Sequence, residues 1–344
     1  MANITVGIVG LPNVGKSTLF NALTKKQVPA ENYPFCTIDP SVGIVAVPDE
    51  RLEKLYEFSL PKVASAKGSS VPRKVPAVIE FTDIAGLVKG ASEGEGLGNK
   101  FLSHIREVDA IVEMVRVFED KDIIHVHNKI DPISDIETIN LELILADMQT
   151  VTKRRGNLVK DIKANKKEAV EEDAVLEKLQ KVLEEGKLAS SLGLDEKEKE
   201  IAKSMHLLSM KPILYVLNTS EAAEKNLLEV KDKIPGPFVI VDPIFEKGFD
   251  DLIKKSYEIL NLITFFTTGE DETRGWTTPY NSTAPIAGTA IHTDFKDKFI
   301  RAEVIEWDKL LEAGSYASAR EKGLLRIEGK EYIVKDGDVV EFRI

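Results

Sequence analysis

Short apolar runs recur along most of this chain, separated by mixed polar stretches. The runs cover residues 4–9, 42–47, 77–83, 109–117, 212–217 and 238–242. Runs of this length, rich in Val and Ile and alternating with helical stretches, are typical of strands in a parallel sheet. The pattern therefore predicts an α/β fold with a doubly wound sheet.

Between residues 139 and 209 the apolar residues follow helical spacing instead. One run contains Leu141, Leu145, Met148, Leu158 and Ile162, and a second contains Leu176, Leu179, Val182 and Leu183. Charged residues fill the other faces, as expected for amphipathic helices. We predict an antiparallel helical hairpin inserted into the α/β domain, with its turn near Asn165–Glu172.

From about residue 277 the chain changes again, to short strand-like runs with turns. The runs cover 290–292, 300–304, 332–334 and 339–342, and Asp336-Gly337-Asp338 is a strong turn signal. This pattern predicts a small α+β module. The expected domains are an α/β domain built from 1–138 and 210–276, a helical insert at 139–209 and a C-terminal module at 277–344.

Composition narrows the class of protein. The chain has 344 residues, is 43% hydrophobic and carries a net charge of −11, so its surface as a whole does not favour nucleic acid. A single cysteine, Cys36, excludes an internal disulfide. No apolar run approaches the roughly 20 residues that cross a bilayer, and the first strand leaves no room for a signal peptide. We expect a cytoplasmic protein without a membrane partner.

The segment Gly10–Thr18 reads GLPNVGKST and matches the phosphate-binding pattern G-x-x-x-x-G-K-[S/T] in full. An apolar strand precedes it and the helix-like Leu19–Leu23 follows, which is the context this loop requires. Lys16 is expected to reach the β- and γ-phosphates, and the Ser17 hydroxyl to bind Mg²⁺. The candidate nucleotide ligands here are Asn13, Val14, Gly15, Lys16, Ser17 and Thr18.

A second pattern, D-x-x-G at Asp83–Gly86, ends an apolar strand. Asp83 is expected to support Mg²⁺ and the Gly86 amide to meet the γ-phosphate, while Thr37 is the natural Mg²⁺ ligand of the first switch. The residue after the pattern is Leu87, which cannot orient water by hydrogen bonding. We therefore expect slow intrinsic hydrolysis that depends on another group, a bound cation or a partner.

Two segments compete for the base-reading loop. Asn128-Lys129-Ile130-Asp131 spells the guanine-reading N-K-x-D, whereas Asn218-Thr219-Ser220-Glu221 does not. Only about nine residues separate Asn128 from the preceding strand, fewer than a parallel crossover needs. The run 212–217 stands directly before Asn218. We therefore expect Asn218, Thr219, Ser220 and Glu221 to form the base loop.

This base loop favours adenine. Thr219 and Glu221 replace the lysine and aspartate of guanine readers, and Asp242-Pro243-Ile244 stands where such proteins carry S-A-K. Unpaired guanine donors would cost about 1–3 kcal/mol, whereas Asn218 and the Thr219 backbone could serve the adenine edge. ATP is the expected substrate, with a GTPase that uses either base loop as the alternative.

A basic stretch lies near the predicted hairpin tip. It contains Lys153, Arg154, Arg155, Lys160, Lys163, Lys166 and Lys167 against one acid, Asp161. Such a face suits rRNA or tRNA, although a solvated helix face gives the same spacing. Lys296, Lys298 and Arg301 form a weaker second candidate. We expect no zinc site and an idle thiol at Cys36 rather than a redox switch.

Together these motifs resemble the Obg-like ATPase (YchF) family of translation-factor P-loop proteins. The matching segments include Gly10–Asn21, Tyr33–Pro40, Asp83–Arg106, Asp135–Asp147, Leu262–Gly269, Ile291–Glu303 and Glu328–Tyr332. The resemblance implies an inserted coiled coil, a C-terminal TGS domain of ubiquitin-like fold, ATP favoured over GTP, and ribosome association. It also implies a K⁺ near the phosphates, because Asn13 is present, and an apolar residue at Leu87 in place of the catalytic glutamine. Many relatives carry a histidine where this chain has Glu113.

The sequence thus favours a slow Mg²⁺-dependent ATPase that acts as a conformational switch on the translation machinery. The rival from another class is a nucleotide-loaded adaptor whose hydrolysis is incidental and whose function is ribosome or RNA binding.

Overall fold

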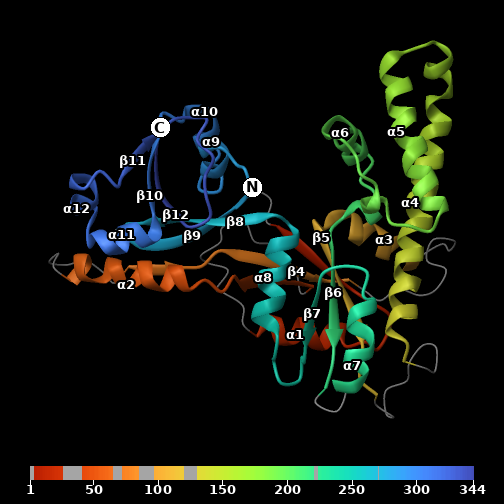
Figure 1. The fold of residues 1–344 in the computed structure, drawn as a ribbon, viewed down its shortest axis with the longest axis horizontal. Helices are drawn as coiled ribbons and strands as arrows, with labels where there is room; N and C mark the ends of the chain where they lie inside the picture. The colour runs from red at the N-terminus through yellow and green to blue at the C-terminus, as the bar shows by residue number, and fades with distance from the viewer. Residues whose placement is uncertain are drawn as a thin grey trace.

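The computed structural model describes residues 4–25, 41–64, 72–84, 97–119, 130–220, 224–269 and 271–344, with side chains omitted at 61–64, 97–100 and 224–226. Figure 1 shows three parts: a sheet flanked by helices, a long helical projection, and a second sheet beside the first.

The first sheet is the predicted α/β sheet. Its six strands run in the order β2-β4-β1-β5-β6-β7. All neighbours are parallel except β2 and β4, which are antiparallel. The strands are β1 (Thr5–Val9), β2 (Val42–Ala46), β4 (Val78–Asp83), β5 (Ala110–Arg116), β6 (Ile213–Asn218) and β7 (Phe238–Val241). The six apolar runs thus predicted all six strands, because each strand is buried between helices.

Helices accompany this sheet, and their apolar residues share one core with it. Helix α1 follows β1, helix α3 precedes β5, and helices α7 and α8 flank β7 in the chain. Their bounds are α1 (Lys16–Thr24), α3 (Leu97–Glu107), α7 (Glu224–Val230) and α8 (Phe249–Ile259). This arrangement places the carboxyl ends of the parallel strands, and the loops that follow them, at one edge.

The helical projection contains α4 (Pro132–Lys163) and α5 (Lys167–Glu184), which pack antiparallel as predicted. The turn spans only 164–166, so it is shorter than the predicted segment up to Glu172, and Asn165 takes a positive φ of 57° there. Helix α4 also begins earlier than residue 139, because Asp131 caps it and Pro132 occupies its first turn. A third helix, α6 (Glu196–Ser204), carries a capping box and completes the insert.

The second sheet has the order β11-β10-β12-β8-β9-β3. Its strands are β8 (Leu262–Thr268), β9 (Glu272–Pro279), β10 (Arg301–Glu306), β11 (Arg326–Glu328), β12 (Asp338–Arg343) and β3 (Arg73–Val75). Strand β8 pairs with both β9 and β12, so β8 and the first residues of β9, which the sequence assigned to the α/β domain, belong to this sheet. The predicted α+β character is confirmed.

Two of the predicted C-terminal strands are wrong. Residues 290–292 form a turn after helix α9 (Ala284–Gly288), in which their amides bond to the carbonyls of Ala287 and Gly288. Residues 332–334 make only an isolated bridge between Ile333 and Thr283. The predicted turn at Asp336–Asp338 is present, and Gly337 adopts a φ of 90° there. The remaining helices are α10 (Asp294–Lys298), α11 (Trp307–Ala313) and α12 (Tyr316–Glu321).

The chain segment between β2 and β4, which contains α2 and β3, joins the two sheets. Helix α2 (Glu50–Ala64) packs Leu52 and Leu55 against Phe266 and Ile305 of the second sheet. Strand β3 then pairs in parallel with β9. Strand β3 thus completes the second sheet, although in the chain it stands between β2 and β4 of the first sheet (Figure 1).

Within the described segments, no helix combines the length and the apolar character needed to span a bilayer.

Candidate nucleotide-binding site

The loop between β1 and α1 has the backbone that a phosphate cradle needs. Gly10, Asn13 and Gly15 take positive φ angles of 153°, 63° and 101°. A Cβ at Gly10 would lie 2.6 Å from the Met114 carbonyl oxygen, and one at Gly15 would lie 2.5 Å from Nδ2 of Asn218. Glycine is thus required by both conformation and space. Gly15 is the N-cap of α1 and no side chain caps this end, so the first-turn amides suit an anion.

Lys16 folds back over this loop. Its Nζ donates to the carbonyl oxygens of Gly10 at 3.0 Å and Leu11 at 2.8 Å. Burial lowers the pKa of the ammonium to about 8, although the nearby Asp83 carboxylate opposes the shift. The charge is thus held close to the amides that would surround a phosphate.

Ser17 in the first turn of α1 faces Asp83 at the end of β4. The Ser17 hydroxyl donates to Oδ2 of Asp83 at 3.1 Å, and the Ser17 side chain is exposed. A hydroxyl and a carboxylate oxygen are ligands that Mg²⁺ prefers, so the donor set fits this ion. Thr18, the next residue of α1, is also exposed.

Asn218 ties the base loop to the phosphate loop. It is the last residue of β6, is 5% exposed, and its Nδ2 donates to the Val14 carbonyl at 2.8 Å. The following amide, that of Thr219, donates to the Val241 carbonyl at 3.0 Å, and the Thr219 hydroxyl donates to the Ser220 carbonyl. Segments that lie 204 residues apart in the chain therefore form one edge of the site.

Several predicted residues lie outside the described part of the chain: Cys36, Thr37, Gly86, Leu87, Glu221, Asn128 and Lys129. Asp131, from the competing N-K-x-D segment, accepts a hydrogen bond from the Ser134 amide and caps helix α4. Its described role is therefore that of a helix cap.

Strand β5 places Met114 behind the loop and the adjacent Glu113 on the opposite face of the sheet. The Met114 methyl lies 3.3 Å from the Cβ position at Gly15, a contact that the sequence did not indicate. Glu113 is 1% exposed, and neither of its carboxylate oxygens has a hydrogen-bond partner in the described structure. Burial, and then the neighbouring Asp135 charge, raise the pKa of Glu113 well above its usual range.

The basic stretch of the insert is partly neutralised by acidic residues of helix α5 and by Asp161 of α4. Arg154 makes two hydrogen bonds to Glu172, and Arg155 bonds to Asp173 and Gln180. Lys166 pairs with Asp161, and Lys167 lies 3.9 Å from Glu171. Lys153, Lys160 and Lys163 are exposed and lie on one side of α4, by its 3.6-residue period. These three lysines form what we call the lysine stripe.

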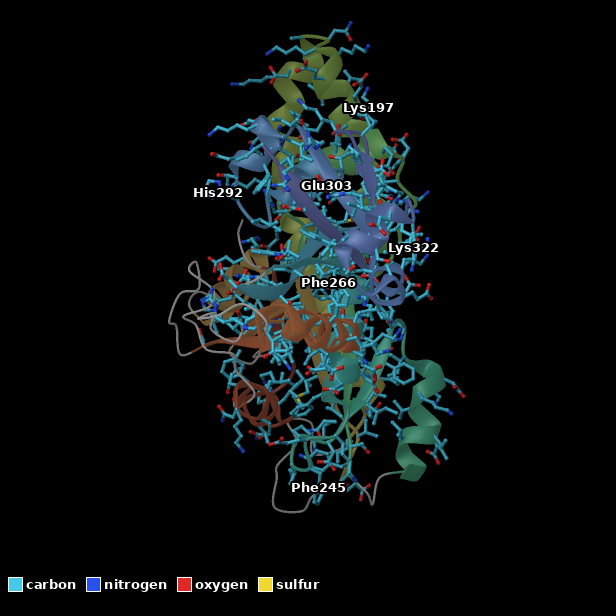
Figure 2. All side chains as sticks on the ribbon, turned by 90° about the vertical axis from the view of Figure 1, so that its left-hand side faces the viewer. Lys197, Phe245, Phe266, His292, Glu303 and Lys322 are labelled. Atoms are coloured by element: carbon cyan, nitrogen blue, oxygen red, sulfur yellow. The ribbon has the colours of Figure 1, made fainter. Side chains whose placement is uncertain are left out.

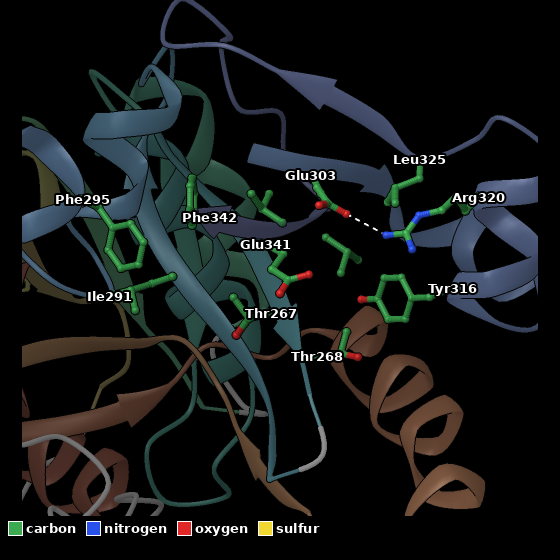
Figure 3. A pocket seen from close by; sticks show the side chains of 12 residues that line it. Thr267, Thr268, Ile291, Phe295, Glu303, Tyr316, Arg320, Leu325, Glu341 and Phe342 are labelled. Atoms are coloured by element: carbon green, nitrogen blue, oxygen red, sulfur yellow. Dashed lines mark hydrogen bonds and ion pairs between the residues drawn. The ribbon is translucent and has the colours of Figure 1, made fainter. Parts of the chain in front are cut away.

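A separate cavity of about 410 Å³ lies in the second sheet, lined by residues of β8, β10, β12 and α12. Figure 3 shows Glu303 paired with Arg320 at its wall, with Tyr316 and Glu341 facing the same space. No P-loop residue lines it, so it is not the nucleotide site.

The fold and this loop define the chain as a P-loop nucleoside triphosphatase. A family model described as "50S ribosome-binding GTPase" matches residues 5–152, and the C-terminal model of YchF GTPases, described as a protein of unknown function, matches residues 262–344. The chain belongs to the YchF family.

Individual relatives cover nearly the whole chain. It is 49% identical to the "Ribosome-binding ATPase YchF" of Bacillus subtilis over 99% of both chains, and 46% identical to the protein of that name in Haemophilus influenzae over 98% of both. The solved structure of the Schizosaccharomyces pombe YchF GTPase is 37% identical, with a TM-score of 0.85 over 99% of this chain and 98% of that one.

Proposed function

We propose that this protein is a ribosome-associated, Mg²⁺-dependent ATPase that prefers ATP to GTP and acts as a slow switch in translation or the stress response. The observation that carries the proposal is the bond from Asn218 to the Val14 carbonyl, which joins a base loop lacking the guanine signature to a complete phosphate loop.

Different residues take different roles in the transfer of the γ-phosphoryl group to water. Lys16 and the amides from Asn13 to Thr18 hold the phosphates, and Gly86 senses the γ-phosphate. Ser17, Thr37 and Asp83 would hold Mg²⁺, which neutralises charge on the phosphates when bound. Leu87 cannot orient the attacking water, so we propose slow turnover that a partner accelerates, with K⁺ near Asn13 as an aid.

Base selection follows from what the base loop lacks. Thr219 and Glu221 stand where guanine readers carry lysine and aspartate. The side-chain amide of Asn218 donates to the Val14 carbonyl and the main-chain amide of Thr219 donates to the Val241 carbonyl, so neither is the donor that meets the purine. A site without the aspartate leaves the N1 and N2 donors of guanine unpaired, which favours ATP.

Ribosome association is supported by the names of the relatives, which are called ribosome-binding ATPases. We assign rRNA or tRNA contact to the lysine stripe together with Lys166 and Lys167, and give the paired Arg154 and Arg155 a structural role. The C-terminal TGS-like module would supply a second contact. Such an assembly places the protein in the cytoplasm. We also propose the domain order of a nucleotide domain, an inserted helical domain and a C-terminal module.

Phosphate release from the four Mg-nucleoside triphosphates, with and without K⁺ and ribosomes, tests the proposal. We expect ATP to be hydrolysed faster than GTP, slowly by the protein alone, and faster with K⁺ or ribosomes. Equal or faster GTP hydrolysis would support the GTPase alternative. A Thr37→Ala variant that fails to hydrolyse ATP but retains full cellular function would support the adaptor alternative.

A further inference from the structure

The loop that follows β7 lies beside the base loop. Strands β6 and β7 are parallel neighbours, with Asn218 in register with Val241. The amide of Thr219 donates to the Val241 carbonyl at 3.0 Å, so the two loops leave the same sheet edge side by side. Ligands of open parallel sheets bind at this edge. Residues 242–247, here called the β7 loop, therefore border the space where a purine would lie.

The main-chain donors at the start of the β7 loop, residues 242–245, are consumed within it. Asp242 and Lys247 exchange two hydrogen bonds of 3.1 Å. Oδ1 of Asp242 accepts the Ile244 amide at 3.1 Å and the Phe245 amide at 3.2 Å. Pro243 has no N–H to offer. The first four residues after β7 thus present carbonyl oxygens but no uncommitted amide.

Two features hold this arrangement in place. Asp242 is only 6% exposed, so its carboxylate is enclosed with the amides that it accepts. Gly248 closes the loop with a φ of 80°, and a Cβ there would lie 2.1 Å from the Ile240 carbonyl oxygen. The side chains of Ile244 and Phe245 are 79% and 62% exposed, and Figure 2 shows Phe245 at the end of the molecule opposite Lys197. Pro243, Ile244 and Phe245 have apolar side chains, so a hydrogen bond from these residues to a base can come only from their main chain.

We propose that the β7 loop selects purines at the 6-position, with Asp242 as the positioning residue and Pro243 as the missing donor. The 6-oxo group of guanine or hypoxanthine needs a donor, which the main chain of residues 242–245 withholds. The 6-amino group of adenine needs an acceptor, which the loop carbonyls supply. This inference rests on the proposed ATPase function and adds a second source of selectivity to the base loop.

Inosine triphosphate is the probe that isolates this effect, because it carries the 6-oxo group of GTP without the 2-amino group that the base loop would read. Dissociation constants of MgATP, MgITP and MgGTP are measured by calorimetry for the wild type, Pro243→Ala and Asp242→Ala. Pro243→Ala adds a main-chain N–H at residue 243, and Asp242→Ala releases the amides of Ile244 and Phe245. We expect MgITP and MgGTP to bind about 5–10-fold more tightly relative to MgATP, the gain of one hydrogen bond.

The controls separate selectivity from folding. Pro235→Ala makes the same substitution before β7, at the other edge of the sheet, and should leave the ITP/ATP ratio unchanged. Asp242→Asn keeps the acceptor oxygen and should retain the wild-type selectivity that Asp242→Ala abolishes. An unchanged ITP/ATP ratio in both Pro243→Ala and Asp242→Ala would overturn the inference. A wild type that binds GTP as tightly as ATP would instead contradict the proposed base preference itself.

Discussion

The side-chain amide of Asn218 donates a 2.8 Å hydrogen bond to the main-chain carbonyl of Val14. Both groups are buried, and Gly15 has no room for a Cβ beside this amide. The contact fixes the phosphate loop against the end of β6, so the two halves of the nucleotide site are built as one unit.

Replacing Asn218 should therefore weaken binding of all nucleotides. Asn218→Ala leaves the Val14 carbonyl buried without this donor, at a cost of about 1–3 kcal/mol. We expect ATP and GTP affinities to fall together, by about 10-fold or more. Calorimetric titration of both nucleotides measures this. A decrease confined to one base would show that Asn218 reads the base and does not support the loop.

Lys16 makes nucleotide binding sensitive to alkaline pH. Its pKa in the folded protein is about 8, because burial disfavours the charge, so the ammonium loses its proton as pH rises through this value. A bound triphosphate favours the charged form. We expect ATP affinity to fall above pH 8 and binding near pH 9 to take up close to one proton. Calorimetry in buffers of different ionisation heat measures the uptake. A flat affinity from pH 7 to 9.5 without proton uptake would contradict this.

Glu113 should make stability depend on pH. Its pKa in the folded protein lies well above the usual 4.5, so the folded state binds the extra proton between these values. Its contribution to stability is then greatest below pH 4.5 and falls as pH rises toward the folded pKa. Glu113→Gln cannot ionise, so we expect it to be more stable than the wild type at pH 8, with a difference that shrinks as pH falls toward 5. Thermal melts of both proteins from pH 5 to 8 test this. An equal or lower melting temperature for the variant at pH 8 would refute it.

Removing Arg51 should loosen the join between the sheets. Its guanidinium bonds to Asp49 and Asp336, and Asp336 also accepts the Thr264 amide of β8. Arg51→Ala leaves two carboxylates facing each other without their counter-ion, so we expect stability to fall by about 1–3 kcal/mol in unfolding experiments. Arg73→Ala is the control, since its pair with Glu272 is exposed and 3.5 Å long. A decrease no greater than that of the control would show that Arg51 does not hold α2 on the second sheet.

The lysine stripe should account for salt-dependent ribosome binding. Replacing Lys153, Lys160 and Lys163 by Glu removes three exposed cations and is expected to weaken co-sedimentation. The slope of log affinity against log salt should flatten by about one for each phosphate that is no longer neutralised. The matched control reverses three exposed lysines elsewhere: Lys233, Lys254 and Lys322. Equal binding of the two triple variants would refute the assignment. Replacing Lys163, Lys166 and Lys167 by Glu reverses the charge at the turn between α4 and α5 and tests that region in the same assay.

The sequence predicted the first sheet well, because every strand is a short apolar run, and β1, β5 and β6 are buried almost throughout. It placed residues 262–276 in the α/β domain, because only the pairing of β8 with β9 and β12 assigns β8 to the second sheet. Strand β3 has three residues, too few to form a pattern. The phosphate loop was recognisable because its backbone demands particular residues. The pairing of Arg154 with Glu172 was not, because it depends on the register between two helices.

The most direct test of this account is calorimetric titration of the folded protein with MgATP, alongside Lys16→Ala. Saturable one-site binding by the wild type, strongly weakened in the variant, is the result that a phosphate loop predicts. Absence of binding to the wild type at millimolar MgATP, or equal binding by both proteins, would contradict the assignment of this loop as the nucleotide site.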